Sequence, residues 1–230
     1  MMKDTNIELN NTAIDINNAV GWGVLFDLDG VLVDSESEYT KIWNRIDEEY
    51  PTGVKDFARK IKGTTLDSIL STYFPDPEIR RNVEKRLYEL EAEMVYDYCQ
   101  GAKELLDALR TNRIPIALFT SSNDLKMAHL YKDIPGIRNY FDVVITGDMV
   151  SHSKPDPEGY LLAAKELGLD PTKCIVVEDS LQGVKAGEAA GCKVVGVAGT
   201  LNAEVLSPHS NIVVNSLANI GISDLEGLVK

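Results

Sequence analysis

Apolar runs of strand length alternate with amphipathic stretches along most of this chain. The apolar runs span residues 24–28, 116–120, 143–146, 175–178, 194–197 and 212–214. Continuous apolar runs of this length are typical of strands buried on both faces, as in a parallel sheet. Helical stretches at about residues 103–110, 157–168 and 180–190 lie between them. The alternation predicts an α/β fold built on a doubly wound parallel sheet.

The stretch between about residues 36 and 100 breaks this alternation. Residues 37–50 and 78–98 have the apolar spacing of amphipathic helices, and no run typical of a buried strand lies between them. Three prolines, Pro51, Pro75 and Pro77, interrupt the stretch. We therefore expect a core formed by residues 20–35 and 101–230, with a small helical domain of residues 36–100 inserted after the first strand. Residues 1–19 form an N-terminal extension, either a flexible tail or a short strap on the core.

Length and charge narrow the classes of function. The chain has 230 residues, enough for one sizeable core or for a core and a small second domain. Its net charge is −13 and it has no run of Lys and Arg, so a nucleic-acid partner, which demands a basic patch, is not expected. No apolar run is long enough to span a bilayer, so no membrane partner is expected either.

The cysteines indicate a reducing compartment. Cys99, Cys174 and Cys192 are odd in number and have no metal-ligand spacing, which predicts free thiols. The N-terminus lacks the basic start and apolar core of a signal peptide. We therefore expect a cytoplasmic protein. The sequence leaves the oligomeric state open, with a monomer or a weak homodimer as the expectation.

Two carboxylates stand directly behind the first predicted strand, in the run Phe26-Asp27-Leu28-Asp29-Gly30. Because side chains alternate along a strand, Asp27 and Asp29 are expected on the same side. Two like charges at close range repel, and a cation between them removes the conflict. Oxygen ligands suit a hard ion such as Mg²⁺. Asp and Gly are also ordinary turn residues, so a surface turn is an alternative interpretation of this run.

Polar groups also follow the later strands. The groups are Thr120-Ser121-Ser122-Asn123 after the second run, Ser153-Lys154-Pro155-Asp156-Pro157 after the third, and Glu178-Asp179-Ser180 at the end of the fourth. Taken singly, they read as a loop or helix cap, a surface lysine and a second helix cap. Ligands in open α/β sheets bind beyond the carboxyl ends of the strands, so all of these groups are expected to meet at one edge. Their convergence favours a functional site.

The combined set has the parts that phosphoryl transfer needs, namely a nucleophile, positive charge around the phosphoryl oxygens and a proton source. Asp27 can act as a carboxylate nucleophile, and Asp29 can supply or remove a proton. Lys154 can offset negative charge on the phosphoryl group and on Asp27. Asp179, with Glu178 close by, can complete a Mg²⁺ site.

The segment after the second strand supplies the expected phosphate contacts. Thr120 offers a hydroxyl, and the backbone N–H of Ser121 can face the same anion. Ser122 and Asn123 continue the segment, and we expect them to bind substrate together with Lys154.

In this order, the four motifs resemble those of the haloacid dehalogenase-like hydrolase superfamily. They are residues 26–35, 120–122, 153–157 and 178–180 with Gly183, and the resemblance covers about residues 22–200. It implies a Rossmann-like core, Asp27 as nucleophile and Asp29 as general acid/base. It also implies Mg²⁺ held by Asp27, the main-chain oxygen of Asp29 and Asp179, with Glu178 assisting. A helical insertion after the first motif is similar to the subclass with a small helical cap, and the closest-looking group contains β-phosphoglucomutases and sugar-phosphate phosphatases.

Two positions depart from the mutases in that group. The mutases resemble this chain around residues 62–65, but they carry an arginine, which grips the second phosphate, where this chain aligns Leu66, and a histidine where it aligns Tyr39. The resemblance makes Gly63 and Thr64 part of a substrate loop, whereas by themselves they read as a helix start. The departures at Leu66 and Tyr39 both weaken the mutase interpretation.

The sequence therefore predicts a Mg²⁺-dependent phosphatase that hydrolyses a small phosphorylated metabolite, with a sugar phosphate as the leading candidate, through an aspartyl-phosphate. The nearest alternative is a β-phosphoglucomutase-like phosphomutase. A non-enzymatic receiver module phosphorylated on Asp is a third hypothesis, but receivers are shorter and have no helical insertion.

Overall fold

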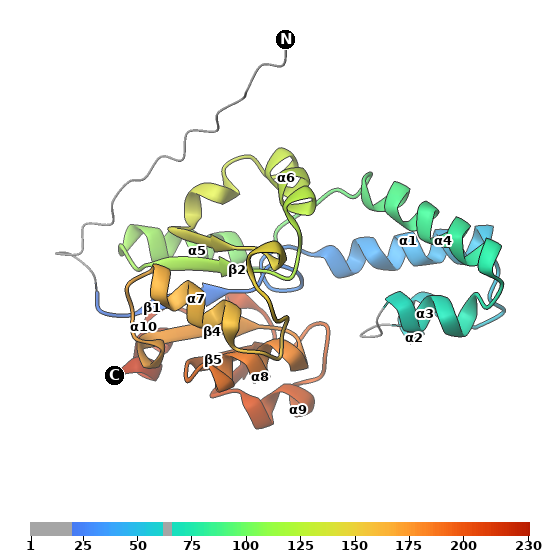
Figure 1. The fold of residues 1–230 in the computed structure, drawn as a ribbon. Helices are drawn as coiled ribbons and strands as arrows, with labels where there is room; N and C mark the ends of the chain where they lie inside the picture. The colour runs from blue at the N-terminus through green and yellow to red at the C-terminus, as the bar shows by residue number, and fades with distance from the viewer. Residues whose placement is uncertain (1–19, 62–65) are drawn as a thin grey trace, which may run out of the picture.

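A parallel sheet forms the centre of the computed structural model, which describes residues 20–61 and 66–230 (Figure 1). Its strands are β1 (Gly23–Phe26), β2 (Ile116–Phe119), β3 (Val143–Ile145), β4 (Cys174–Glu178), β5 (Lys193–Val197) and β6 (Ile212–Val214). They lie in the order β3-β2-β1-β4-β5-β6. In the parallel register, Val24 of β1 lies beside Ile116 of β2 and Ile175 of β4. The predicted α/β fold and its doubly wound parallel sheet are confirmed.

Helices cover both faces of the sheet because alternate strand side chains are apolar on both. Leu25 of β1 packs into one apolar cluster with α7 (Glu158–Glu166), α8 (Leu181–Ala189) and α9 (Ala203–Leu206). Its neighbours Val24 and Phe26 pack into the other, with α5 (Ala102–Thr111), α6 (Asp124–Asp133) and α10 (Ile222–Val229). Short 3₁₀ turns complete the connections: η2 (Ile137–Tyr140), η3 (Gly147–Met149), η4 (Pro171–Lys173), η5 (Ser207–His209) and η6 (Leu217–Asn219).

The first strand ends earlier than predicted. It stops at Phe26, and the chain then turns, with the carbonyl of Leu28 accepting hydrogen bonds from the backbone N–H groups of Leu32 and Val33. Asp27 still bonds to β4, because its backbone N–H donates to the carbonyl of Val177 at 3.0 Å, whereas Asp29 lies in the turn. The strand pattern therefore does not extend over both residues of this pair, and alternation along a strand does not determine how the two side chains lie.

Between β1 and α5 lie the helices α1 (Ser35–Glu49), α2 (Phe57–Lys60), α3 (Leu66–Tyr73) and α4 (Pro77–Glu91). Figure 1 shows these four helices as a group that stands apart from the sheet. They share buried apolar side chains, and Trp43 of α1 meets Phe57 of α2 edge to face at 5.9 Å. The α1–α4 group thus has its own apolar interior, and α1 encloses it by packing against both α2 and α4.

The helix predicted over residues 78–98 ends at Glu91. The chain then returns to the sheet in an extended form, and Tyr98 pairs with Val33 in an antiparallel bridge. The backbone N–H of Asp34 donates to the carbonyl of Asp97 at 3.0 Å. The two connections of the α1–α4 group are therefore paired with each other, and this long-range pairing takes the place of the last predicted turns of helix.

The remaining predictions concern the short helices, the N-terminal extension, the loop before α3 and the cysteines. The sequence analysis missed α2, α6, α9 and α10, whereas α3 begins at Leu66, just after the residues that by themselves read as a helix start. The N-terminal extension at residues 1–19 and the loop residues Gly63 and Thr64 lie outside the described residues. All three cysteines are free, as predicted. No helix within residues 20–61 and 66–230 is long and apolar enough to cross a membrane.

Candidate active site

The end of β1 and the end of β4 share one ammonium group. Lys154, from the loop before α7, lies 2.5 Å from Oδ1 of Asp27 and 2.6 Å from Oε1 of Glu178. All three side chains are nearly inaccessible to solvent. Burial opposes the charge of Lys154, but Asp27 and Glu178 outweigh it and raise the pKa of the ammonium above its ordinary value. The group therefore stays charged beside Asp27.

Glu178 is held by a full set of hydrogen bonds. Oε1 accepts from Lys154 and from the hydroxyl of Tyr160 at 2.9 Å. Oε2 accepts from the backbone of Asp179, and from the backbone and hydroxyl of Ser180. Helix α8 approaches so closely that a Cβ on Gly183 would lie 1.8 Å from the carboxyl carbon. Glu178 is therefore fixed as the anchor of Lys154.

Asp179 is a buried carboxylate with no ion-pair partner among the described side chains. Its Oδ2 accepts a hydrogen bond from the hydroxyl of Thr200, and Gly30 leaves room for it, since a Cβ there would lie 2.0 Å from Oδ2. Burial, followed by the charges of Asp27 and Glu178, raises the pKa of Asp179 to about 8 from its ordinary 3.8. Burial also raises the pKa of Asp27 to about 7, against the pull of Lys154.

Asp29 has its own ammonium partner, Lys126 of α6. The two carboxylate oxygens of Asp29 lie 2.8 and 2.9 Å from Nζ of Lys126, and the Ser122 hydroxyl donates to Oδ2 at 3.1 Å. Burial works against the charge of Asp29, but Lys126 outweighs it and holds the pKa of the carboxyl below its ordinary value. Asp27 and Asp29 thus face two different lysines.

The four polar residues that follow β2 make different contacts in the structure. Thr120 is buried, and its hydroxyl accepts from the backbone N–H of Ser122 at 3.0 Å. Ser121 and Ser122 line the cavity beside Asp29. The Asn123 side chain accepts from the backbone of Lys126 and caps α6, so its observed contact is structural.

The donor set fits a magnesium ion. Carboxylate oxygens of Asp27, Glu178 and Asp179 lie within 4.8 Å of one another, and all three residues are buried. Lys154 is the ammonium that reaches two of these three carboxylates, and it leaves Asp179 unpaired within the described set. Hard oxygen ligands and surplus negative charge suit Mg²⁺. Both oxygens of Glu178 are already engaged, so Asp27 and Asp179 are the side chains best able to hold the ion.

A cavity of about 1120 Å³ opens between Asp29 and the α1–α4 group. Lys126 and Asp29 of the core line it together with Tyr39 of α1 and Glu91 of α4. The Tyr39 hydroxyl donates to Glu91 at 2.9 Å. Leu66 lines a smaller cavity of about 230 Å³ within the α1–α4 group, with Trp43 and again Tyr39. A molecule held at Asp27 and Asp29 would extend toward the larger cavity.

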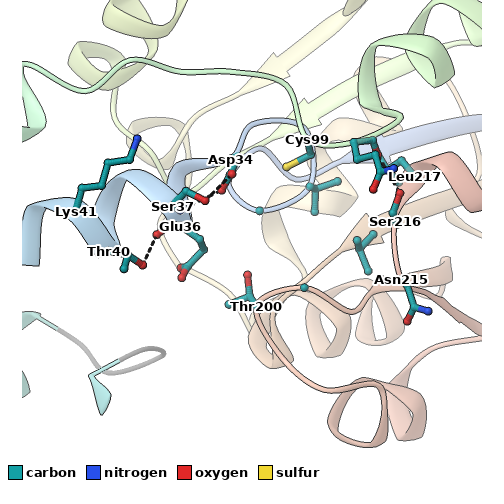
Figure 2. Close-up of a pocket in the computed structure, with 15 residues that line it drawn as sticks. Asp34, Glu36, Ser37, Thr40, Lys41, Cys99, Thr200, Asn215, Ser216 and Leu217 are labelled. Carbon is teal, nitrogen blue, oxygen red and sulfur yellow. Dashed lines mark hydrogen bonds between the residues drawn. The ribbon is translucent and has the colours of Figure 1, made fainter. Parts of the chain in front are cut away.

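A second opening, of about 570 Å³, lies beside the connections of the α1–α4 group. Figure 2 shows Thr200 and Asn215 on one side of it and Asp34 and Ser37 on another. Asp34 accepts from the backbone N–H of Ser37 at 3.0 Å and so caps α1. Thr200 lines this opening and also bonds Asp179, so the opening lies next to the carboxylate cluster.

Three contributors were missed by sequence reasoning, namely Lys126, Tyr160 and Thr200. Each contacts a predicted residue from an element distant in the chain. Lys126 stands in a helix that the apolar pattern did not predict, with the exposed Leu125 beside it. No local signal separated these side chains from ordinary surface or core residues.

The chain is similar to known hydrolases over most of its length. Residues 23–191 match the haloacid dehalogenase-like hydrolases. The chain is 34% identical to the phosphorylated carbohydrates phosphatase of Thermotoga maritima, over 78% of this chain and 86% of the relative. It is 33% identical to hexitol phosphatase A of Escherichia coli, over 87% and 94%. Among solved structures, β-phosphoglucomutase from Clostridium difficile superposes with a TM-score of 0.66 at 25% identity, covering 90% of this chain and 96% of that one.

Proposed function

This chain belongs to the haloacid dehalogenase-like hydrolase family, and as a phosphoric monoester hydrolase of that family we propose that it hydrolyses a phosphorylated sugar or sugar alcohol with Mg²⁺. Its relatives include phosphatases of phosphorylated carbohydrates and of hexitols, which supports this substrate class. We also propose that it works in the cytoplasm, as a monomer or a weak homodimer, on a small metabolite.

The observation that carries the proposal is the environment of Asp27. Its carboxylate is buried, contacts Lys154 at 2.5 Å, and has Asp29 two residues along the chain, paired with a separate lysine. A carboxylate beside an ammonium is suited to attack phosphorus, because the ammonium also neutralises the phosphoryl oxygens. A second carboxylate on the cavity side is suited to proton transfer.

In the first step, an oxygen of Asp27 attacks phosphorus, and the bond from phosphorus to the ester oxygen breaks. Asp29, which Lys126 keeps ionised in the substrate-free protein, takes up a proton as the phosphate ester binds and gives that proton to the departing oxygen. Lys154, Thr120 and the N–H of Ser121 bind the phosphoryl oxygens in this proposal. The product alcohol leaves, and an acyl phosphate remains on Asp27.

In the second step, ionised Asp29 takes a proton from water, and the water oxygen attacks phosphorus. The bond between phosphorus and the Asp27 oxygen breaks, which frees phosphate and restores the carboxylate. Asp27 and Asp179, with the main-chain oxygen of Asp29, would hold Mg²⁺, which when bound would supply positive charge to the phosphoryl group. Glu178 assists by keeping Lys154 in place.

We further propose that the α1–α4 group is a cap, with residues 36–100 as its domain and residues 20–35 and 101–230 as the catalytic core. The paired connections at Val33 and Tyr98 give it one attachment to the core. Closure of the cap would exclude bulk water from the acyl phosphate. Gly63 and Thr64 are proposed to belong to the loop that meets substrate.

A panel assay tests the phosphatase proposal. Phosphate release is measured for sugar phosphates, sugar-alcohol phosphates, nucleotides and p-nitrophenyl phosphate, with Mg²⁺ or with EDTA. We expect turnover of sugar or sugar-alcohol phosphates that EDTA abolishes and added Mg²⁺ restores. Full turnover in EDTA would remove the metal from the proposal, and no turnover of any monoester would remove the phosphatase.

A phosphomutase is the second candidate, supported by the structural likeness to β-phosphoglucomutase. Leu66 and Tyr39 argue against it, because a leucine cannot hold a second phosphate. The test supplies β-glucose 1-phosphate with and without a bisphosphate primer and follows glucose 6-phosphate and free phosphate separately. Glucose 6-phosphate formed much faster than phosphate would favour the mutase. Leu66→Arg should improve bisphosphate binding if the alignment is correct.

A further inference from the structure

Lys126 stands between the proton-transfer carboxylate and the cavity that faces the α1–α4 group. Its Nζ lies 2.8 and 2.9 Å from the two oxygens of Asp29. It also lies 5.7 Å from the centre of the Tyr39 ring on α1. About a quarter of the Lys126 side chain is exposed, and the residue lines the larger cavity. The ammonium is therefore within reach of a molecule in that cavity.

Distances limit what this ammonium can contact. The ester oxygen that Asp29 protonates must lie about 3 Å from a carboxyl oxygen of Asp29, which puts it within about 6 Å of the Lys126 nitrogen. An oxygen on the carbon next to the ester carbon can come closer still. Two of the three ammonium hydrogens are directed to Asp29, and the third remains to donate to such an oxygen.

The charges around the cavity select the chemistry of the leaving group. Asp29 and Glu91 are carboxylates that line the same cavity as Lys126, so a second anionic group would meet two like charges. An apolar group would leave Lys126 and Glu91 without new partners after desolvation. A hydroxyl accepts from Lys126 and donates to a carboxylate such as Glu91, and so matches both sides.

We propose that Lys126 is a substrate-binding residue that recognises an oxygen on the carbon adjacent to the phosphorylated carbon, and that the leaving group is therefore polyhydroxylated. This inference rests on the proposed phosphatase function and deepens it. Lys126 binds the leaving group while it stays in contact with Asp29. Selectivity for the leaving group thus comes from a core helix as well as from the α1–α4 group.

Competition against p-nitrophenyl phosphate hydrolysis tests this proposal, because that substrate has no adjacent hydroxyl. Inhibition constants are measured in Mg²⁺ for sorbitol 6-phosphate, which has the adjacent hydroxyl, and for n-butyl phosphate, which lacks it. In the wild-type protein we expect sorbitol 6-phosphate to bind about tenfold more tightly. In Lys126→Met its inhibition constant should rise about tenfold, while that of n-butyl phosphate changes less than about twofold.

Lys132→Met, on the same helix and at the rim of the same cavity, controls for the loss of one positive charge. It should change both inhibition constants by less than about twofold. Lys126→Gln keeps a hydrogen-bond donor and serves as the second variant if Lys126→Met does not fold.

Three outcomes would overturn the proposal. One is a wild-type protein with no preference for sorbitol 6-phosphate. The others are equal weakening of both inhibitors in Lys126→Met, which would assign Lys126 a role only through Asp29, and no weakening of either. A wild-type protein that hydrolyses no phosphate monoester, p-nitrophenyl phosphate included, is a different result, because it would contradict the phosphatase function itself.

Discussion

The sheet edge, formed by Asp27, Lys154, Glu178 and Asp179, and the α1–α4 group hold their charged side chains in different ways. At the sheet edge the charges are buried, and Glu178 alone accepts five hydrogen bonds. In the α1–α4 group the guanidinium of Arg86 pairs with the Glu49 carboxylate of α1, and both side chains are partly exposed. Tyr39 and Glu91 are the polar pair that faces the cavity.

This difference indicates a division of labour. A preorganised, water-poor edge suits a reaction step that must be the same for every substrate. A cavity wall with few polar contacts can be altered residue by residue without disturbing that step. Changes at the edge should therefore affect all substrates alike, and changes across the cavity should depend on the leaving group.

Asp27→Asn gives the largest expected effect. An amide is a poor nucleophile, so turnover of every phosphate ester should fall by more than about 10³-fold, with no phosphoenzyme formed. Phosphate release and acid-quenched phosphoenzyme are the measurements. The exposed Asp107→Asn is the control for a lost carboxylate. Turnover close to that of the wild type would contradict the covalent mechanism.

Asp29→Asn comes next and should depend on the leaving group. It keeps the nucleophile but removes the proton donor, so turnover of a sugar phosphate should fall about 10²–10⁴-fold. The first step with p-nitrophenyl phosphate should be affected much less, because nitrophenolate leaves without a proton. A burst experiment separates the two steps. Equal loss in both first steps would argue against Asp29 as the acid.

Gly183→Ala should weaken the sheet edge through packing. The new Cβ would lie 1.8 Å from the Glu178 carboxyl, so the free energy of unfolding should fall by about 1–3 kcal/mol. Gly227→Ala is the matched helical control in α10, where a Cβ meets nothing within 4 Å. It should stabilise the protein by about 0.5–1 kcal/mol. Urea unfolding measures both, and equal effects would contradict the close approach of α8 to Glu178.

The affinity for Mg²⁺ should rise with pH. In the metal-free fold the pKa values of Asp27 and Asp179 are raised to about 7 and about 8, from an ordinary 3.8. Raised pKa values mean that the folded protein holds these two protons more tightly than the unfolded chain does. The stability that the bound protons contribute to the fold is lost as pH rises through 7–8. Mg²⁺ must displace the same protons.

Between pH 6 and 8 the Mg²⁺ concentration at half-saturation should therefore fall with rising pH. For each proton that Mg²⁺ displaces, the fall should be roughly tenfold per pH unit. Thermal shift at a series of Mg²⁺ concentrations measures it without relying on turnover. Asp179→Asn should flatten the dependence. A half-saturation constant that does not change with pH would contradict the assignment of these two carboxylates.

Tyr39→Phe gives the smallest expected effect, on the cavity side. It removes one hydrogen bond to Glu91, worth about 0.5–1.5 kcal/mol. The KM for sorbitol 6-phosphate should rise by about two- to tenfold with a smaller change in kcat. An equal fall in kcat for p-nitrophenyl phosphate would contradict the separation of roles between the sheet edge and the cavity wall, because Tyr39 would then act on the chemistry that all substrates share.

Much of the fold followed from local pattern. Buried parallel strands read as continuous apolar runs, and all six were located to within two residues at each end. Helix ends that depend on remote partners were less predictable. The helix expected through residue 98 ends at Glu91, because Tyr98 pairs with Val33 across the chain. Helix α6 escaped prediction because Leu125, an apolar residue, faces solvent.

By itself, the sequence determined the fold class, the family and the group of strand-end residues around Asp27. It could do so because parallel strands bring their carboxyl ends to one edge whatever the details of packing. Only the tertiary structure decided which partner each charge meets. Lys126 pairs with Asp29 across 97 positions of the chain, and Tyr39 with Glu91 across 52. Such pairings depend on how helices are oriented over the sheet, and local residue order does not encode that orientation.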